Sequence, residues 1–185
     1  MVTLNATANL ILDAAEIRMR QSGFNAVSIR DLADHVSVKS ASVHYYFPTK
    51  EDLGVALVER YHARFFEQLQ ASTSDGVPAP QRLRAFTESY RRSLVTADAI
   101  CLCAMLGAEG PGLPASVAAA VRGFFAANID WLAKVLPANS KGGEPQQEAA
   151  VIVAGLHGAM ILATSLGDIA VFDATVARLL RPYLA

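Results

Sequence analysis

The sequence predicts an all-α fold, with a small three-helix domain over residues 1–50 and a larger helical domain over residues 51–185. Apolar residues recur with helical spacing along most of the chain, and no run alternates with period two for long enough to predict a sheet. Breaks rich in Gly, Pro, Ser or Asn separate the periodic segments. Because 52% of the 185 residues are hydrophobic and only 18% are charged, the chain can bury a sizeable core.

Two helices are expected before residue 36. Asn5 or Thr7 can cap the first helix, and Gly23 is a favourable residue for its C-terminal end. Ser28 then has the side chain of a good N-cap, which predicts a second helix over Ile29–His35.

A third, short helix is expected over about residues 39–45, after a break at residues 36–38. Pro48 cannot continue this helix because its ring excludes the helical hydrogen bond. Thr49 can cap a fourth helix that has two acidic residues in its first turn and reaches about Ala71.

Further helices are expected in the larger domain, over about residues 80–96, 99–109, 114–136, 146–165 and 173–184. The fourth of these overlaps residues 149–167, a stretch that is long and apolar enough to be a candidate membrane span. Its Ala and Gly content and the presence of His157 favour a buried subunit interface instead, and we expect no membrane association.

Charge and cysteine usage narrow the class of protein. The formal net charge of −1 does not by itself indicate nucleic-acid binding, although DNA responds to the local surface rather than to the total. Cys101 and Cys103 would point about 200° apart on a helix, so a disulfide between them is not expected. No basic region followed by a long apolar run begins the chain, and a cytoplasmic protein is expected.

The most informative window is residues 27–53. Apolar residues there can close a miniature core between two short helices, which leaves the outer face of the second helix polar. This is the arrangement of a helix-turn-helix, whose second helix enters the major groove of DNA. No Asp or Glu occurs from His35 through Lys50, so this helix offers a locally cationic surface to phosphates.

This window resembles the N-terminal domain of the TetR family of bacterial transcriptional regulators. The resemblance covers about residues 8–57 without a gap and rests on five short segments: ILDAAE at 11–16, Gly23-Phe24, Ser28, IRDLA at 29–33 and YYFPTKEDL at 45–53. It implies a ligand-responsive DNA-binding regulator, a homodimeric repressor that leaves a palindromic operator when a small effector binds the C-terminal domain. The family often has Lys-Gly-Thr-Leu-Tyr where this chain has SASVH at 40–44, so no operator sequence is carried over.

Seven residues are candidates for DNA contacts. Ser28 can offer its hydroxyl and backbone N–H to a phosphate, or serve only as a cap. Three residues near the start of the third helix can reach base edges, although solvated surface is an equal alternative for the serines. Lys50 can pair with a phosphate or with an acidic neighbour. The full set is Ser28, Lys39, Ser40, Ser42, His44, Tyr45 and Lys50.

A homodimer is expected because a single small reader binds DNA weakly. Small residues within residues 150–166 would allow close approach of two helices, and the last helix can complete a four-helix bundle. The candidates are Val151, Gly155, Gly158, Leu162, Val176 and Leu180. The alternative is that these residues form only an intrachain core.

An effector pocket is expected inside the larger domain, as the family resemblance implies. Its candidate lining is mostly apolar with a few polar groups, which suits a small ligand. The candidates are Cys101, Cys103, Met105, Phe124, Asn128, Trp131, His157 and Met160. Ordinary core packing is the commoner role for each aromatic or Met residue, and a hydrogen-bonded core histidine is the default for His157.

The same residues bear on other classes of function. An enzyme is not expected because no nucleophile–base pair, phosphate loop or dinucleotide fingerprint is present. Neither a metal nor a cofactor is expected, since the four His show no ligand-like spacing. A helical interaction module without DNA contact is one alternative. Another is a thiol- or electrophile-sensing regulator acting through Cys101 and Cys103, if a cation or helix N-terminus lowers a thiol pKa.

Overall fold

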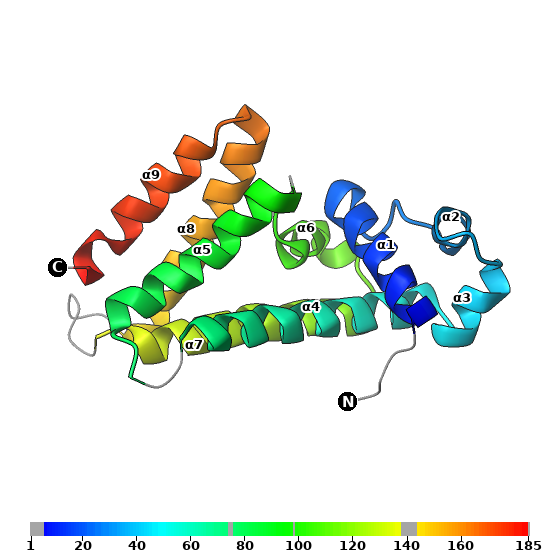
Figure 1. The fold of residues 1–185 in the computed structure, drawn as a ribbon, viewed down its shortest axis with the longest axis horizontal. Coiled ribbons are helices and arrows are strands. Elements are labelled where there is room, and N and C mark those ends of the chain that lie inside the picture. Colours follow the sequence, from blue (N-terminus) through cyan, green and yellow to red (C-terminus); the bar gives the residue numbers. More distant parts are fainter. Residues whose placement is uncertain (1–5, 74–75, 98, 138–143, 185) are drawn as a thin grey trace. The chain divides into compact units, whose positions relative to one another are not determined.

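A computed structural model describes residues 6–73, 76–97, 99–137 and 144–184, and all regular structure in these ranges is helical (Figure 1). The cap candidate Asn5 and the predicted loop at 139–143 lie outside the described residues. The chain divides into two compact units, Met1–His62 with Leu102–Arg122 and Ala63–Cys101 with Gly123–Ala185. These two units are defined by packing. The division at residue 50 into a DNA-binding part and an effector-binding part remains a prediction.

The first unit is built around three short helices and the start of a long one. It also contains a later segment of the chain, Leu102–Arg122, and the first helix of that segment packs against α1. Its elements are α1 (Ala6–Ser22), α2 (Ile29–His35), α3 (Ser40–Tyr46), the beginning of α4 (Lys50–Ser72), α6 (Leu102–Glu109), the 3₁₀ helix η1 (Gly110–Gly112) and the beginning of α7 (Ala115–Val135).

Local capping positions the helices of the first unit. Gly23 ends α1 in the left-handed region at φ +84°, as the sequence predicts. The Ser28 hydroxyl accepts a hydrogen bond from the Asp31 N–H at 3.1 Å and begins α2. Thr49 and Asp52 exchange hydrogen bonds at the start of α4, because Thr49 N–H donates to the carboxylate at 3.0 Å and Asp52 N–H donates back to the hydroxyl at 3.0 Å.

The core of the first unit confirms part of the predicted miniature core. Leu32, Ala33 and Val43 are fully buried, whereas Ile29, Val36 and Val38 are only partly buried. Helices α1, α2 and α3 all contact one another. Burial of these three side chains fixes α3 against α2 and leaves the outer face of α3 to solvent.

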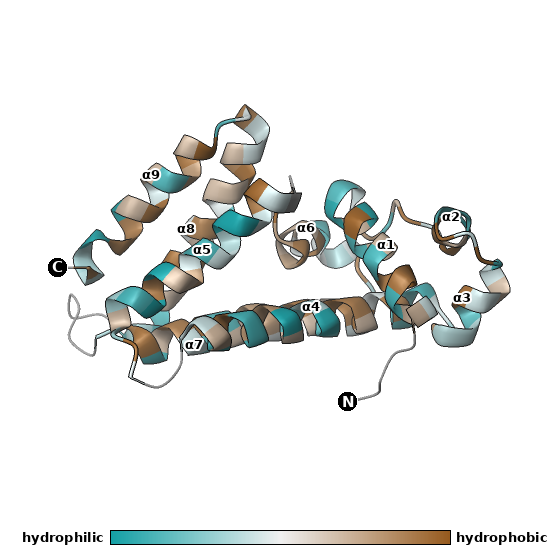
Figure 2. Cartoon of the chain, viewed as in Figure 1, coloured by the Kyte–Doolittle hydropathy of each residue, from teal (hydrophilic) through white to brown (hydrophobic). Residues whose placement is uncertain are grey.

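The second unit contains the remaining helices. They are the end of α4, α5 (Ala79–Ala97), the end of α7, α8 (Pro145–Leu166), α9 (Ile169–Leu180) and the 3₁₀ helix η2 (Arg181–Tyr183). Figure 2 shows hydrophilic and hydrophobic residues alternating around α5 and α9, the pattern of amphipathic helices. Both helices contact each other and α8.

Close packing joins α8 to α9. Gly167 ends α8 at φ +65°, and the Asp168 carboxylate caps α9 by accepting a hydrogen bond from the Ala170 N–H at 2.9 Å. At Gly155, a Cβ would lie 2.7 Å from Leu179 Cδ1, so a larger residue there would require the Leu179 side chain to move. Gly155 therefore serves contact within the chain.

Some predicted boundaries differ from the structure. α6 begins at Leu102 rather than near residue 99, and residues 110–112 form a turn of 3₁₀ helix rather than a plain break. The last helix begins at Ile169, not at residue 173, because Asp168 caps it. Thr7 lies inside α1 and is not its cap.

Within the described residues, α8 is the one helix long and apolar enough to cross a membrane by length and composition. Core helices of soluble proteins meet the same criterion. Ile152, Leu156 and Met160 are buried in the second unit, which is consistent with the predicted role of this helix in a core or interface.

Candidate functional site

The outer face of α3 is the first part of the candidate site. Lys39 occupies the N-cap position in an extended conformation, and its side chain is exposed. Tyr45 is 80% exposed, and its ring lies 5.0 Å from that of Tyr46 in an edge-to-face contact. An aromatic residue with this exposure has its hydroxyl available for a partner outside the chain.

The remaining predicted residues of α3 lie around these two. Ser40 and Ser42 are half-buried and His44 is exposed. The His44 Nδ1 donates to the Pro48 carbonyl oxygen at 3.0 Å. A hollow of about 470 Å³ beside the helix is lined by residues of α1 and α3 and the turn before α3: Thr7, Val38, Ala41, Ser42, Tyr45 and Tyr46.

Lys50 has contacts within the first unit. Its Nζ donates to the Asn25 carbonyl oxygen at 3.2 Å and lies 4.6 Å from the centre of the Phe24 ring. Partial burial lowers the pKa of the Lys50 amine, and the nearby Glu109 carboxylate opposes that effect. The structure thus places this cation against the α1–α2 turn, and its predicted phosphate contact would add to these bonds or replace them.

Glu109 is a positioning residue that sequence reasoning missed. Its carboxylate, at the end of α6, accepts hydrogen bonds from the Phe24 N–H at 2.7 Å and from the Asn25 N–H at 3.1 Å. The Asn25 side-chain amide donates to the same carboxylate at 3.2 Å and to the Gly112 carbonyl oxygen at 3.2 Å. At Gly23, a Cβ would lie 2.8 Å from Glu109 Oε1. Gly23 therefore serves this contact as well as the end of α1.

Two further links join elements of the first unit. The Arg60 guanidinium on α4 lies 2.9 Å from Asp13 Oδ1 and 3.5 Å from Glu16 Oε2, both on α1. Ser116 at the start of α7 donates a hydrogen bond to Glu51 at the start of α4. Polar contacts from α4 thus hold α1, those from α6 hold the α1–α2 turn, and α7 is linked to the start of α4.

The predicted effector residues fall in both units. Cys103 and Met105 lie on α6 in the first unit, whereas Cys101, Phe124, Asn128, Trp131, His157 and Met160 lie in the second. The set thus spans both units, and its role as one effector site remains a prediction. Trp131 stacks on Phe86 at 5.2 Å, with the Arg82 guanidinium 5.4 Å from the Trp131 ring centre, and is only partly buried.

The buried polar residues of the second unit lie among aromatic rings. Tyr90 Oη donates to Asn128 Oδ1 at 2.8 Å, and Asn128 Nδ2 donates to the Phe124 carbonyl oxygen at 2.7 Å. These bonds satisfy a side chain that is fully buried. The His157 ring lies edge-to-face with Tyr90 at 5.0 Å and with Phe125 at 5.1 Å.

His157 and Cys101 interact electrostatically. His157 Nδ1 donates to the Val153 carbonyl oxygen at 2.7 Å. Burial disfavours the charged imidazole, but Cys101 and the Val153 carbonyl favour it, and together they raise the pKa of His157 above 6.5. Both cysteines are buried, and no disulfide joins them.

An apolar stripe of α8 is exposed on the surface of the second unit. Val151 is 61% exposed, Leu162 is 54% exposed and Leu166 is 66% exposed, and a Cβ at Gly158 would meet no atom within 4 Å. Of the other predicted interface residues, Val176 is half-buried and Leu180 is buried within its own unit.

No group of three or more His, Cys, Asp or Glu in the described ranges has the arrangement of a metal site.

The sequence of the chain is similar to those of known bacterial regulators. Residues 11–57 match the family model described as "Bacterial regulatory proteins, tetR family". Over 108 residues the chain is 32% identical to the transcriptional regulator AcuR of Cereibacter sphaeroides, an alignment that spans 57% of this chain and 49% of AcuR. It is 26% identical to the HTH-type transcriptional repressor NemR of Escherichia coli over 170 residues, which cover 87% of this chain and 85% of NemR.

Solved structures agree over nearly the whole chain. A TetR transcriptional regulator from Legionella pneumophila has a TM-score of 0.88 and 28% identity, with 98% of both chains covered. One from Agrobacterium tumefaciens has a TM-score of 0.87 and 29% identity, covering 95% of this chain and 96% of that one. The reduced form of E. coli NemR has a TM-score of 0.80 and 25% identity, with 94% and 95% covered.

Proposed function

The chain belongs to the TetR family of bacterial regulatory proteins, DNA-binding transcriptional regulators that are not enzymes, and from this premise we propose that it is a repressor which a small effector releases from its operator. The observation that carries the proposal is the exposed face of α3, which presents Lys39 and Tyr45 on a helix held by the buried Val43. A helix with this surface fits the major groove. The partner is duplex DNA, and the working compartment is the cytoplasm.

Two copies of the chain bind one palindromic operator. The exposed stripe of α8, with Val151, Gly158 and Leu162, supports a two-fold contact, since a monomer seldom leaves such an apolar stripe in water. Each copy would place one α3 in a half-site, about one turn of DNA from the other.

The effector site we propose lies in the second unit, around Asn128 and His157. These buried polar side chains are surrounded by aromatic rings, an environment typical of sites for small, mostly apolar ligands. Mass spectrometry of the purified protein, denatured to release any bound small molecule, would identify a candidate effector. Adding it back is expected to release operator DNA.

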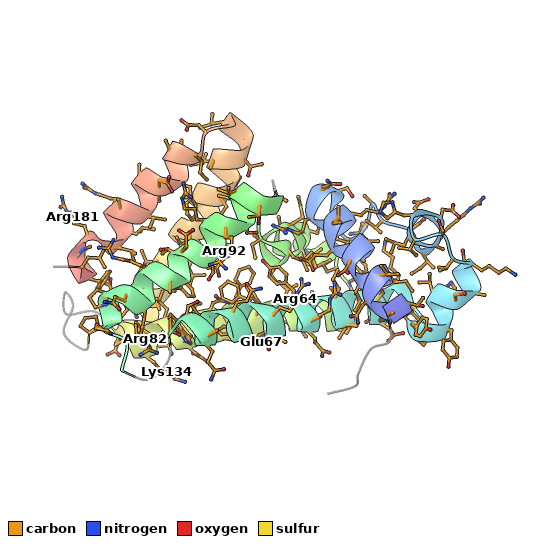
Figure 3. The ribbon with its side chains drawn as sticks, viewed as in Figure 1. Arg64, Glu67, Arg82, Arg92, Lys134 and Arg181 are labelled. Atoms are coloured by element: carbon orange, nitrogen blue, oxygen red, sulfur yellow. The ribbon has the colours of Figure 1, made fainter. Side chains whose placement is uncertain are left out.

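Operator binding is tested by fluorescence anisotropy with DNA from upstream of the gene, at several salt concentrations. We expect a dissociation constant of about 10⁻⁸ M, and we expect the affinity to fall steeply as the salt concentration is raised. Lys39→Ala is expected to weaken binding and to reduce the salt slope by about 1. Lys134→Ala, which changes an exposed lysine of the second unit (Figure 3), is the matched control and should bind as the parent does. Equal affinity and slope for both variants would remove α3 from the DNA interface.

A second candidate function is thiol sensing through Cys101 or Cys103. The specific observation is that the buried Cys101 interacts with His157 and favours its charged form. A neighbouring cation is the condition under which a cysteine becomes reactive. Iodoacetamide, which replaces the thiol proton with a carbamidomethyl group and releases iodide, is expected to lower operator affinity in the parent and in Cys103→Ser. Cys101→Ser should resist the reagent. If iodoacetamide leaves the operator affinity of the parent unchanged, the cysteines are ordinary core residues.

A further inference from the structure

A groove of about 860 Å³ opens between α5 and the segment formed by α9 and η2, entirely within the second unit. Its floor is apolar, because Phe172 and Leu180 are buried there. Thr87 is also buried, and its hydroxyl donates to the Arg84 carbonyl oxygen at 3.0 Å within its own helix. The floor therefore offers apolar surface, with the Thr87 hydroxyl already satisfied.

An ion pair closes one end of the groove. The Arg91 guanidinium on α5 contacts the Asp173 carboxylate on α9 through two hydrogen bonds, Nε to Oδ1 at 2.8 Å and Nη2 to Oδ2 at 3.1 Å. This bidentate geometry uses the fork of the arginine fully. Glu88, also on this wall, lies near Arg91 and favours its charge, as Asp173 does more strongly.

Two arginines stand at the other end. The two walls run in opposite directions (Figure 1), so Arg84, seven residues before Arg91, lies at the same end as Arg181, eight residues after Asp173. The rise of an α-helix separates this end from the ion pair by about 10 to 12 Å. Arg84 and Arg181 are exposed, and no salt bridge to either occurs among the residues that the structure describes. Figure 3 shows Arg181 projecting from the end of α9.

We propose that this groove binds a small amphipathic anion, with its carboxylate at Arg84 and Arg181 and its apolar chain along Phe172, Val176 and Leu180. Guanidinium forks match carboxylates in shape and charge, and neither fork is used within the described chain. The volume of about 860 Å³ is within the range of small-molecule sites. The length of the floor suits a medium-length chain. This site is separate from the aromatic cluster around Asn128 and His157 and goes beyond the function proposed above.

Calorimetric titration of the full chain with sodium octanoate tests the proposal. Two other probes separate the contribution of the carboxylate from that of the apolar chain. 1-Octanol has the same chain without the charge, and acetate has the charge without the chain. We expect octanoate to bind more tightly than either, and its affinity to fall as salt is raised. Equal affinity for octanoate and octanol would overturn the role of the arginines.

Variants locate the site. Arg84→Gln and Arg181→Gln are each expected to weaken octanoate binding about fivefold. The matched control is Arg92→Gln, which changes an exposed arginine of α5 that does not line the groove and should leave the affinity unchanged (Figure 3). Ala85→Phe adds a ring to the α5 wall and is expected to abolish binding while the circular dichroism spectrum stays that of the parent.

Some results would overturn the groove as a ligand site. These are absence of any octanoate heat in the parent, and binding that survives unchanged in Arg84→Gln, Arg181→Gln and Ala85→Phe together. The latter would place the fatty anion elsewhere in the chain. Operator affinity without ligand is measured on the same preparations. Parent-like operator binding accompanied by failure of the octanoate series refutes the groove alone and leaves the proposed regulator function standing.

Discussion

Glu109 connects two parts of the chain that are 84 and 85 residues apart in sequence, because its carboxylate accepts the backbone N–H groups of Phe24 and Asn25. Both N–H groups lie where α1 has ended and α2 has not begun, so they lack helical partners. A carboxylate is well suited to this position, since bonds from N–H groups to a charged acceptor are stronger than those to a neutral one.

Replacement of Glu109 by Gln is therefore expected to destabilise the first unit. The neutral amide keeps one acceptor oxygen and turns its NH₂ toward donors, and the cost is about 1–2 kcal/mol in the free energy of unfolding. Urea unfolding followed by circular dichroism measures it. Glu67→Gln, at an exposed position on α4 (Figure 3), should change stability by no more than about 0.5 kcal/mol. If the two variants were equally stable, the carboxylate would have no positioning role.

Tyr45 separates the contribution of a hydroxyl from that of a ring. Tyr45→Phe retains the edge contact with Tyr46 and removes only the phenolic oxygen. We expect operator affinity to fall about fivefold, the value of one hydrogen bond to a phosphate, with the stability unchanged. Tyr45→Ala should bind no better than Tyr45→Phe. Anisotropy titrations at one fixed salt concentration make the comparison, and parent-like affinity in Tyr45→Phe would assign the side chain to plain solvated surface.

At the scale of elements, helix ends could be predicted wherever a strong cap is present. The start of α2 at Ile29 follows from Ser28, and the start of α4 follows from Pro48 and Thr49. The start of the last helix could have been found from Asp168, an N-cap residue directly after Gly167, but the apolar stretch behind it was not assigned to a helix. Local caps act within a few residues, so they can be read from a short window.

The contacts that position the site could not be predicted in this way. Glu109, Arg60 and the Arg91–Asp173 pair join residues far apart in sequence, and nothing in their local windows marks them. Lys50 illustrates the same point. Its position after Thr49 indicates a surface lysine, but in the folded chain its amine contacts Phe24 and Asn25. The solvent-facing residues of α3 are easier to predict, because helical spacing alone distinguishes the buried Val43 from the exposed Tyr45.

The link between α5 and α9 has a pH dependence whose sign follows from Asp173. Hydrogen bonds from Arg91, together with its charge, lower the pKa of the Asp173 carboxyl below 3.8. A group whose pKa is lowered on folding stabilises the fold above its unfolded pKa, and this contribution disappears as the pH falls through the folded pKa. We expect Asp173→Asn to lower Tm by no more than about 2 °C at pH 7, because the pair is solvent-exposed.

Thermal unfolding of the parent and Asp173→Asn at a series of pH values checks this sign. The difference between the two should be constant from neutral pH to about pH 5 and should vanish below the folded pKa of Asp173. Glu67→Gln, at an exposed position on α4 (Figure 3), is the control and should show no such convergence. A difference that grows toward acid pH would contradict the assigned pair.

At the scale of the whole molecule, the exposed stripe of α8 predicts that function requires two copies. Leu162, Ile161 and Val151 are each about half exposed or more, and with Gly158 they form a surface on which another helix could lie closely. A charge at its centre would have to be buried in the dimer but could remain solvated in the monomer. Leu162→Glu is therefore expected to dissociate the dimer without unfolding the chain.

Sedimentation velocity, circular dichroism and operator anisotropy together measure this outcome. The monomer should retain its helical content, and its affinity for a two-half-site operator should fall by about 100-fold or more, because the second contact is no longer tethered to the first. Val95→Glu places the same charge on a similarly exposed apolar position of α5, 59% exposed against 54% for Leu162, and should remain a dimer with parent-like operator affinity. If Val95→Glu dissociated while Leu162→Glu stayed dimeric, the two copies would meet through α5 rather than α8, and the arrangement of the two α3 helices on DNA would have to be reconsidered from that face.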